Sequence, residues 1–471
     1  MYLILVFIFC AIAININKPL QMDELSTFFH CSSKSYHELG NANISGVNMI
    51  PPSYFYLMWG IDSLFGLNKI LMRVVPLIFG ILSIIIVFVL LRDQVDDKTA
   101  IFSIFTVFTH CPIFLFSICE ARPYSMYFFL VLLFIYISSI KENNIVFFIC
   151  IIINLLIPST FYFGGIYCIS ICAMVCIYRF INNLPFLKYF LSSTFGWLLF
   201  LFLSFPTFLS QVNSTYTSNL KNIHQIHSSA LFSLQGMQVY FPITLAILVL
   251  ISFKRNNSIQ VGLFYTFIST SLLLVPIITF LICKFFQFEM FQERYFIPST
   301  FFYIIFYCTI IHRFQLIRIK SSFINIHLVY CFLVLTYLTS SYAKAFSYDD
   351  FSKSLKPIQF NDSPVFTFSR RVAFQLSYEN YSAYLIVGDK NYSNHMISFS
   401  KHLNPIPLDE FYSTLNQMLN DFDQVFYVST PWVNENLNEI KRRFSANSII
   451  INDLGIIKSN QINSVYSLTK Y

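Results

Sequence analysis

The chain has 471 residues, of which 56% are hydrophobic and only 11% are charged. A water-soluble domain carries about 25% charged residues, so a soluble surface cannot cover most of this chain, which is expected to lie in lipid. The formal net charge is +7, but the basic residues interrupt apolar runs and form no stripe, so nucleic acid is excluded as an expected partner.

Apolar stretches predict about eleven transmembrane helices, because a span needs about 20 apolar residues. The uncharged run 145–178 is too long for one span, and Pro158, Ser159 and Thr160 are expected to divide it in two. The predicted spans are residues 2–14, 74–91, 99–116, 124–140, 145–157, 161–178, 190–209, 237–253, 259–283, 296–311 and 323–342.

The Lys and Arg residues predict the orientation of these spans, since cytoplasmic loops are enriched in both. With the N-terminus inside, the inner loops carry most of the basic residues that follow the second span, and an odd number of spans places the C-terminus outside. The inner residues are Arg92, Lys98, Lys141, Arg179, Lys188, Lys254, Arg255, Arg313, Arg318 and Lys320; the outer ones are Arg122, Lys221, Lys284 and Arg294.

Two outer regions are too large to be simple connections. In the first outer loop, residues 15–73, the stretch 54–65 reads as an interfacial helix, with Tyr54, Tyr56 and Trp59 at headgroup depth. The second region, residues 343–471, shifts to a soluble composition. Strands are expected at 383–387, 425–429, 448–452 and 465–469, and helices at 409–419 and 433–444, which together suggest a small α/β domain.

The predicted fold is therefore an all-α polytopic membrane domain, residues 1–342, followed by a small α/β extracytoplasmic domain, residues 343–471. Asp23 and Glu24 begin its first outer loop. A carboxylate near a membrane exit can act as the base that takes a proton from an attacking hydroxyl. The alternative is a solvated acidic pair at a helix start, where it complements the helix dipole.

Charged residues recur at two later helix ends on the same predicted face. Glu120 and Arg122 lie between the third and fourth spans, and Arg294 precedes the tenth. Charges at the edge of apolar helices are costly and usually functional, and a planar guanidinium binds phosphate well. The alternatives are a topology anchor at Glu120 and Arg122 and headgroup snorkelling at Arg294. The sequence lacks the glycine motifs of nucleotide-binding sites, which disfavours a nucleotide-sugar donor.

The order of these motifs resembles the C-type glycosyltransferase superfamily. The closest branch is the bacterial group that includes dolichyl-phosphate-mannose protein mannosyltransferases and aminoarabinose transferases. The resemblance covers about the first 310 residues. It rests on Asp23-Glu24, Ile50-Pro51-Pro52-Ser53-Tyr54-Phe55-Tyr56, Leu71-Met72-Arg73-Val74-Val75-Pro76, Glu120-Ala121-Arg122-Pro123-Tyr124 and Arg294-Tyr295.

The resemblance implies a bundle of eleven to thirteen helices, a polyprenyl-phosphate sugar donor and a C-terminal domain that caps the site. It assigns catalysis to Asp23, with Glu24 beside it, and donor phosphate binding to Arg122 and Arg294. Supporting positions are Glu120, Tyr124, Tyr295 and Tyr54.

Where the family often has His before the Pro-Pro pair, this chain has Ile50, so a divalent metal cofactor stays open, with His30 and His37 as candidate ligands. The expected activity is that of an inverting membrane glycosyltransferase with a glycan, lipopolysaccharide or protein acceptor. The expected location is the bacterial inner membrane with the site facing the periplasm, or alternatively the endoplasmic reticulum membrane. A lipid-linked sugar flippase and a polysaccharide polymerase are the alternative functions.

Overall fold

A computed structural model describes residues 22–45, 50–213 and 293–313, with short gaps at 93, 110 and 141–142. In the C-terminal part it describes residues 363–367, 382–387, 404–429 except 423, 449–453 and 464–470. Short stretches within 6–12, 264–281, 329–337 and 373–378 complete the description. The predicted span 237–253 and the predicted helix 433–444 lie outside the described residues, and the spans 2–14, 259–283 and 323–342 are described only in part.

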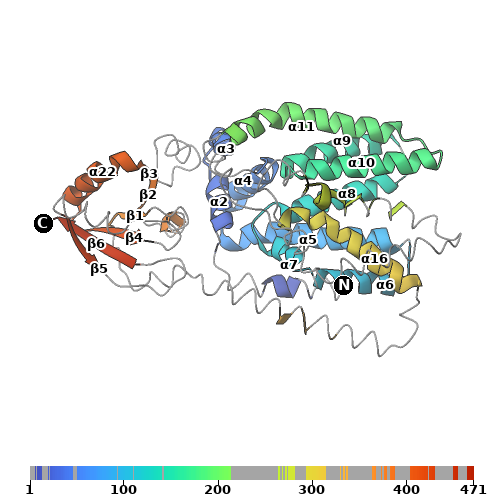
Figure 1. Ribbon diagram of the computed structural model, residues 1–471, viewed down its shortest axis with the longest axis horizontal. Coiled ribbons are helices and arrows are strands. Elements are labelled where there is room, and N and C mark those ends of the chain that lie inside the picture. The colour runs from blue at the N-terminus through green and yellow to red at the C-terminus, as the bar shows by residue number, and fades with distance from the viewer. Residues whose placement is uncertain are drawn as a thin grey trace.

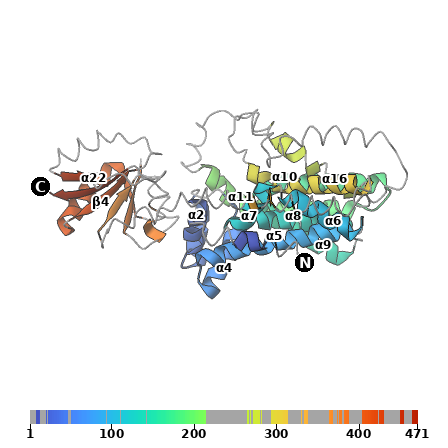
Figure 2. The same cartoon turned by 90° about the horizontal axis from the view of Figure 1, so that it is seen from below.

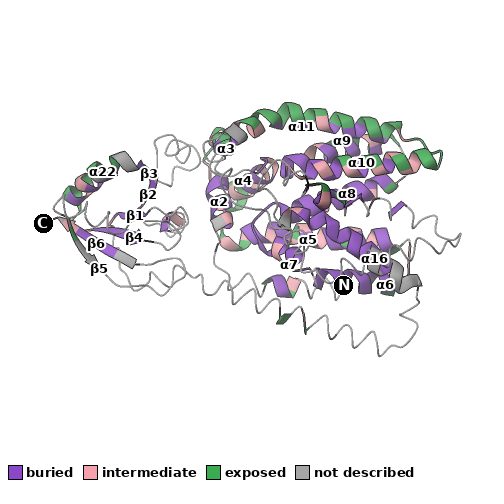
Figure 3. Cartoon of the chain, viewed as in Figure 1, coloured by how far each residue is buried: buried purple, intermediate pink, exposed green. Residues whose placement is uncertain are grey.

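Apolar helices lie side by side in a bundle that makes up most of the described structure (Figures 1 and 2). Three of them, α5, α10 and α11, are long and apolar enough to cross a membrane. Only 28% of the apolar window of α11 is buried, so this helix presents much of its surface to lipid (Figure 3). The helices are α5 (Lys69–Arg92), α6 (Asp97–Thr109), α7 (Pro112–Cys119), α8 (Tyr124–Ser139), α9 (Asn144–Thr160), α10 (Gly164–Ile181), α11 (Leu187–Asn213), η2 (Glu293–Ser299) and α16 (Thr300–Arg313).

The predicted division of residues 145–178 is confirmed, because α9 ends at Thr160 and α10 begins at Gly164. The predicted span 99–116 is not one continuous helix. It consists of α6 and a helix from Ile113 to Cys119 that are bent by 81° relative to each other. Pro112 explains the break, since it cannot donate a backbone hydrogen bond to the preceding turn and is well suited to the first turn of a new helix.

Three short helices of the first loop lie at one end of the bundle, between it and the C-terminal sheet (Figures 1 and 2). They are α2 (Met22–Cys31), α3 (Tyr36–Ile44) and α4 (Ser53–Phe65). The Trp59 indole donates to the backbone oxygen of Ser33 (2.8 Å) and so ties α4 to the turn between α2 and α3. The expected helix at 54–65 is confirmed, but Tyr54 is fully buried and cannot reach the headgroups; Leu64 and Phe65 are the exposed residues of α4.

Two transmembrane helices approach closely at a glycine. A Cβ added at Gly196 of α11 would lie 2.8 Å from the backbone oxygen of Ile151 in α9, which cannot move away without distorting that helix. We therefore expect Gly196→Ala to lower the free energy of unfolding by about 1–3 kcal/mol, as overpacking does. The matched control is Gly60→Ala in α4, where a Cβ meets nothing within 4 Å. Thermal unfolding of both variants in detergent tests this; equal stability of the two would contradict it.

The C-terminal domain contains a six-stranded sheet with the order β3-β2-β1-β4-β6-β5. Strands β1, β2, β3 and β4 are parallel to one another, and β6 pairs antiparallel with β4 and β5. The strands are β1 (Val365–Thr367), β2 (Ala383–Val387), β3 (Asn404–Pro407), β4 (Val425–Ser429), β5 (Ile449–Asp453) and β6 (Ser464–Lys470), and α22 (Leu408–Asp421) joins β3 to β4.

The two faces of this sheet have different neighbours, since successive strand residues point to opposite sides. Ile386 packs with Phe411 and Leu415 of α22 in one buried cluster. Leu385 belongs instead to the continuous buried cluster of the helical bundle. The ring of Tyr378 lies 5.0 Å from that of Phe28 in α2. The sheet domain therefore rests against the helix that carries Asp23 and Glu24.

Candidate active site

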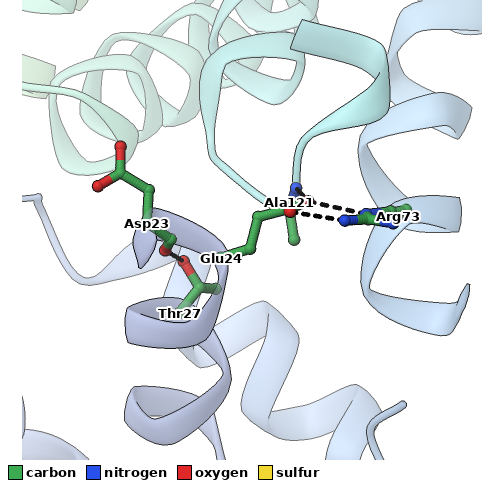
Figure 4. Close-up of polar contacts among 5 residues, drawn as sticks. All are labelled: Asp23, Glu24, Thr27, Arg73 and Ala121. Carbon is green, nitrogen blue, oxygen red and sulfur yellow. Dashed lines mark hydrogen bonds and ion pairs between the residues drawn. The ribbon is translucent and has the colours of Figure 1, made fainter. Parts of the chain in front are cut away.

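The site is built around the first turn of α2, where Asp23 and Glu24 follow each other. The Glu24 side chain is fully buried and forms a bidentate ion pair with Arg73 of α5. Arg73 donates from Nε to Oε1 (2.8 Å) and from Nη2 to Oε2 (2.6 Å). The backbone N–H of Ala121 also donates to Oε1 (3.1 Å) (Figure 4). One carboxylate thus joins α2, α5 and the turn between α7 and α8.

Asp23 has a different environment from its neighbour. Its side chain is partly exposed, and in Figure 4 its carboxylate points away from the pair formed by Glu24 and Arg73. The backbone oxygen of Asp23 accepts a hydrogen bond from the Thr27 hydroxyl (3.0 Å). Its place in the first turn of a helix is electrostatically favourable for an acidic side chain. Because Arg73 neutralises Glu24, the repulsion between two adjacent carboxylates is relieved, and each can take a separate role.

Arg122 reaches the same turn of α2 from the connection between α7 and α8. Its Nη1 donates to the backbone oxygen of Asp23 (3.2 Å) and lies 3.4 Å from the Thr27 hydroxyl. A tight turn directs it there, in which the Arg122 N–H donates to the Glu120 oxygen (2.7 Å). Glu120 and Arg122 are both buried, at 1% and 6% exposed. The structure therefore brings the predicted guanidinium into contact with the helical turn that carries both predicted carboxylates.

The motif Arg294-Tyr295 lies beside the connection between α7 and α8 that carries Arg122. The Tyr295 ring of η2 is 6.2 Å from the ring of Tyr124, the second residue after Arg122. It also packs against Phe161 (4.8 Å) and Phe163 (5.2 Å). Arg294 belongs to η2 by its backbone, and its side chain is outside the described part of the chain. These contacts place the backbone of the second predicted phosphate-binding arginine next to the first.

Tyr54 of α4 is buried near these charged groups. Burial raises the pKa of its hydroxyl well above the usual value, and Glu24 and Arg122 are among the groups that act on it electrostatically. Within the described residues, this hydroxyl has no hydrogen-bond partner. Tyr54 therefore packs behind the site in the present conformation.

Arg73 is the main partner that the sequence interpretation missed. It appeared there only as part of a family motif, although it lies in the first turn of an apolar helix, where a charged residue is costly and usually paired. The cost of an unpaired charge at this place was the signal from which a partner for Arg73 could have been expected. Its partner was hidden because Glu24 lies 49 residues earlier in the chain.

The candidate metal ligands do not form a cation site. His30 is buried, and its Nε2 lies 2.7 Å from Oδ1 of Asn43, whereas His37 is exposed and lies beside Asn41. No three His, Cys, Asp or Glu side chains gather in the described ranges in a way that could hold a metal ion. Within the described residues, His30 and His37 are therefore not placed to hold a divalent cation together.

No protein-family model and no curated protein sequence matches the chain. Several solved structures, in contrast, are similar to it. ArnT from Cupriavidus metallidurans in the apo state is similar with a TM-score of 0.60 and 11% identity over 98% of this chain and 97% of ArnT. ArnT bound to undecaprenyl phosphate gives 0.59 and 12% over 99% and 97%. An Archaeoglobus fulgidus oligosaccharyltransferase complex with zinc and sulfate gives 0.46 and 13% over 90% of this chain and 68% of that chain.

The likeness to ArnT extends over both the helical bundle and the C-terminal sheet, since nearly the whole length of each chain is matched. ArnT is an aminoarabinose transferase of the C-type superfamily. The expected fold is therefore confirmed at the level of architecture: this chain has an ArnT-like fold.

Proposed function

We propose that the chain is an inverting membrane glycosyltransferase that moves a sugar from a polyprenyl-phosphate donor to an acceptor hydroxyl. One observation carries the proposal: the partly exposed Asp23 and the buried Arg122 meet at a single helical turn. A base and a phosphate-binding cation at that spacing are what displacement of a lipid phosphate requires. The similar structure of ArnT with bound undecaprenyl phosphate supports a donor of this class.

In this proposal Asp23 is the general base. Its carboxylate takes the proton from the acceptor hydroxyl while the hydroxyl oxygen attacks the anomeric carbon of the donor sugar. The bond between that carbon and the phosphate oxygen breaks with inversion, and polyprenyl phosphate leaves with the bonding electron pair. Glu24 is assigned the positioning role, since its buried ion pair with Arg73 leaves it no access to an acceptor.

The arginines neutralise the departing phosphate. The guanidinium of Arg122 is held at the α2 turn, and its buried setting strengthens its attraction to an anion compared with a solvated arginine. Arg294 is assigned the same role from its sequence and from the place of η2 beside Tyr124. Tyr295 supports this wall of the site by packing on Phe161.

The site is proposed to face the exterior of the membrane, which in a bacterium is the periplasmic side of the inner membrane. The support is the excess of Lys and Arg in the loops at the other end of the spans. Candidate acceptors are a glycan, lipopolysaccharide or a protein. In this arrangement the C-terminal sheet domain, which touches α2 through Tyr378, lies on the acceptor side of the membrane.

The purified chain in nanodiscs, incubated with a radiolabelled polyprenyl-phosphate monosaccharide and an acceptor extract, tests the proposal. The expected result is release of free polyprenyl phosphate together with one labelled sugar on each acceptor. Labelled chains that grow by repeated addition would instead make it a polymerase. In sealed vesicles, movement of intact donor across the membrane without cleavage would make it a flippase.

A further inference from the structure

A chain of hydrogen bonds connects the end of α11 to the last turn of α2, at the opposite end of that helix from Asp23. The Tyr162 hydroxyl, between α9 and α10, donates to Oε1 of Gln211 (2.9 Å). Nε2 of Gln211 donates to the backbone oxygens of Asn43 (2.7 Å) and Ile50 (3.4 Å). The Asn43 side chain continues the chain, because its Oδ1 lies 2.7 Å from Nε2 of His30.

The contacts of Gln211 explain why a glutamine occupies this position. Its side chain is completely buried, both N–H groups of its amide donate to backbone oxygens, and its oxygen accepts from Tyr162. An unpaired amide would be costly at such a place, so a glutamine with every polar group satisfied indicates specific docking. Through it the end of a membrane helix holds the loop segments that carry α3 and enter α4.

His30 extends this docking to α2. Because an amide oxygen can only accept, His30 donates from Nε2 and is the tautomer protonated there. Its ring stacks on Phe55 of α4, with ring centres 3.9 Å apart and planes 12° from parallel. Burial lowers the pKa of His30 to about 3, so the ring is neutral near pH 7 and the contact keeps its form across the physiological range.

The helix that carries Asp23 is therefore held at both ends. Arg122 contacts its first turn, and His30 lies in its last turn. At a rise of 1.5 Å per residue these points are about 10 Å apart along the axis, so a tilt at one end moves the other. A displacement of about 1 Å of a reacting group can cost 10²-fold in rate.

We infer that Tyr162, Gln211, Asn43 and His30 form a positioning network that fixes the angle of α2 and so aims the Asp23 carboxylate at the acceptor. The inference rests on the function proposed above for Asp23. None of the four residues touches the reacting atoms; they act through α2. Asn43 begins the stretch Asn43-Ile44-Ser45, which matches the acceptor pattern for N-glycosylation. Its side chain is buried against His30, so the folded chain does not offer it for modification.

Two tyrosines provide a matched test. Tyr162→Phe removes one hydroxyl hydrogen bond from the network and leaves the ring to pack on Phe208. Tyr189→Phe removes an equivalent bond, from its hydroxyl to the Ile140 oxygen (2.9 Å), near the opposite end of α11. We expect Tyr162→Phe to lower kcat about tenfold with an unchanged KM for the donor, because positioning is lost and donor binding is not. Tyr189→Phe should stay within about twofold of the parent, as expected of a site far from the chemistry.

Hydrogen exchange of the α2 amides supplies a readout that needs no activity. Faster exchange in α2 for Tyr162→Phe, with unchanged exchange for Tyr189→Phe, would support the network. This holds even if the parent protein transfers no sugar, because absence of transfer would contradict only the proposed function. Gln211→Met should reproduce the effect more strongly. If Tyr162→Phe matched Tyr189→Phe in both exchange and kcat, the inference would be overturned.

Discussion

Replacement of Asp23 by asparagine should lower the rate of sugar transfer by about 10²–10⁴-fold, the usual contribution of a general base. Asparagine keeps the size of the side chain and its place in the first turn of α2 but cannot take a proton at neutral pH. Because the Thr27 hydroxyl and Arg122 donate to the backbone oxygen of Asp23, their anchoring of the turn should persist. Initial rates of polyprenyl phosphate release in nanodiscs provide the measurement.

The control for this variant is Asp97→Asn. Asp97 is also an aspartate in the first turn of a helix, α6, and it is exposed and outside the site. Both variants lose a favourable interaction with a helix dipole, about 0.3–1 kcal/mol, so a general loss of stability would affect them alike. Full transfer activity in Asp23→Asn would remove this residue from the chemistry.

Breaking the ion pair between Glu24 and Arg73 should have the largest effect on stability. Both side chains are buried, at 0% and 1% exposed, and either single replacement leaves a charge without its partner in a low dielectric. Glu24→Gln and Arg73→Met are each expected to lower the free energy of unfolding by about 3–5 kcal/mol. Unfolding followed in detergent by circular dichroism, at constant protein concentration, provides the comparison.

The double variant Glu24→Gln/Arg73→Met sharpens this prediction. It removes both charges, so its loss of stability should be smaller than the sum of the two single losses by about 0.5–3 kcal/mol. Additive losses would show that the two groups do not interact energetically. Transfer activity should stay low in the double variant, because the Ala121 N–H that Glu24 also binds belongs to the turn that carries Arg122.

Composition predicted the bundle well because lipid imposes a simple rule, a long apolar helix for each crossing. The helices α5, α10 and α11 match the predicted spans 74–91, 161–178 and 190–209. The bend between α6 and α7 could not be predicted in the same way, since the run 99–116 contains no Asp, Glu, Lys or Arg and hydropathy carries no information on direction. Pro112 was the one local signal, and prolines also occur inside helices here, as Pro76 does in α5.

In the C-terminal domain, the strands with a clear local sequence pattern were predicted, whereas those that depend on their neighbours in the sheet were not. The five-residue strands β2 and β4 were predicted with their bounds, β5 and β6 within one residue, and α22 within two. β1 has only three residues, and β3 contains Pro405 and Pro407, which argue against a strand. β3 is nevertheless tolerated because it lies at the edge of the sheet, where a proline need not donate to a further strand.

The grouping of Asp23 with Arg122 followed from assigning both to one face of the membrane. The division of labour between Asp23 and Glu24 did not, because successive helix residues point about 100° apart and the sequence does not tell which direction is buried. Only the fold, by placing Arg73 of α5 on one side of the turn, makes Glu24 a structural residue and leaves Asp23 accessible.

Two anchors of the first loop come much later in the chain than the loop itself. Glu24 needs the Ala121 N–H 97 residues onward, and Asn43 needs Gln211 168 residues onward. At about 5–20 residues per second of synthesis, the segment holding the acidic pair must therefore wait on the order of ten seconds or more for the last of these helices to be made. A nascent chain arrested before Gln211 would carry the Asp23 carboxylate on an undocked segment, so the proposed site is completed late in biogenesis.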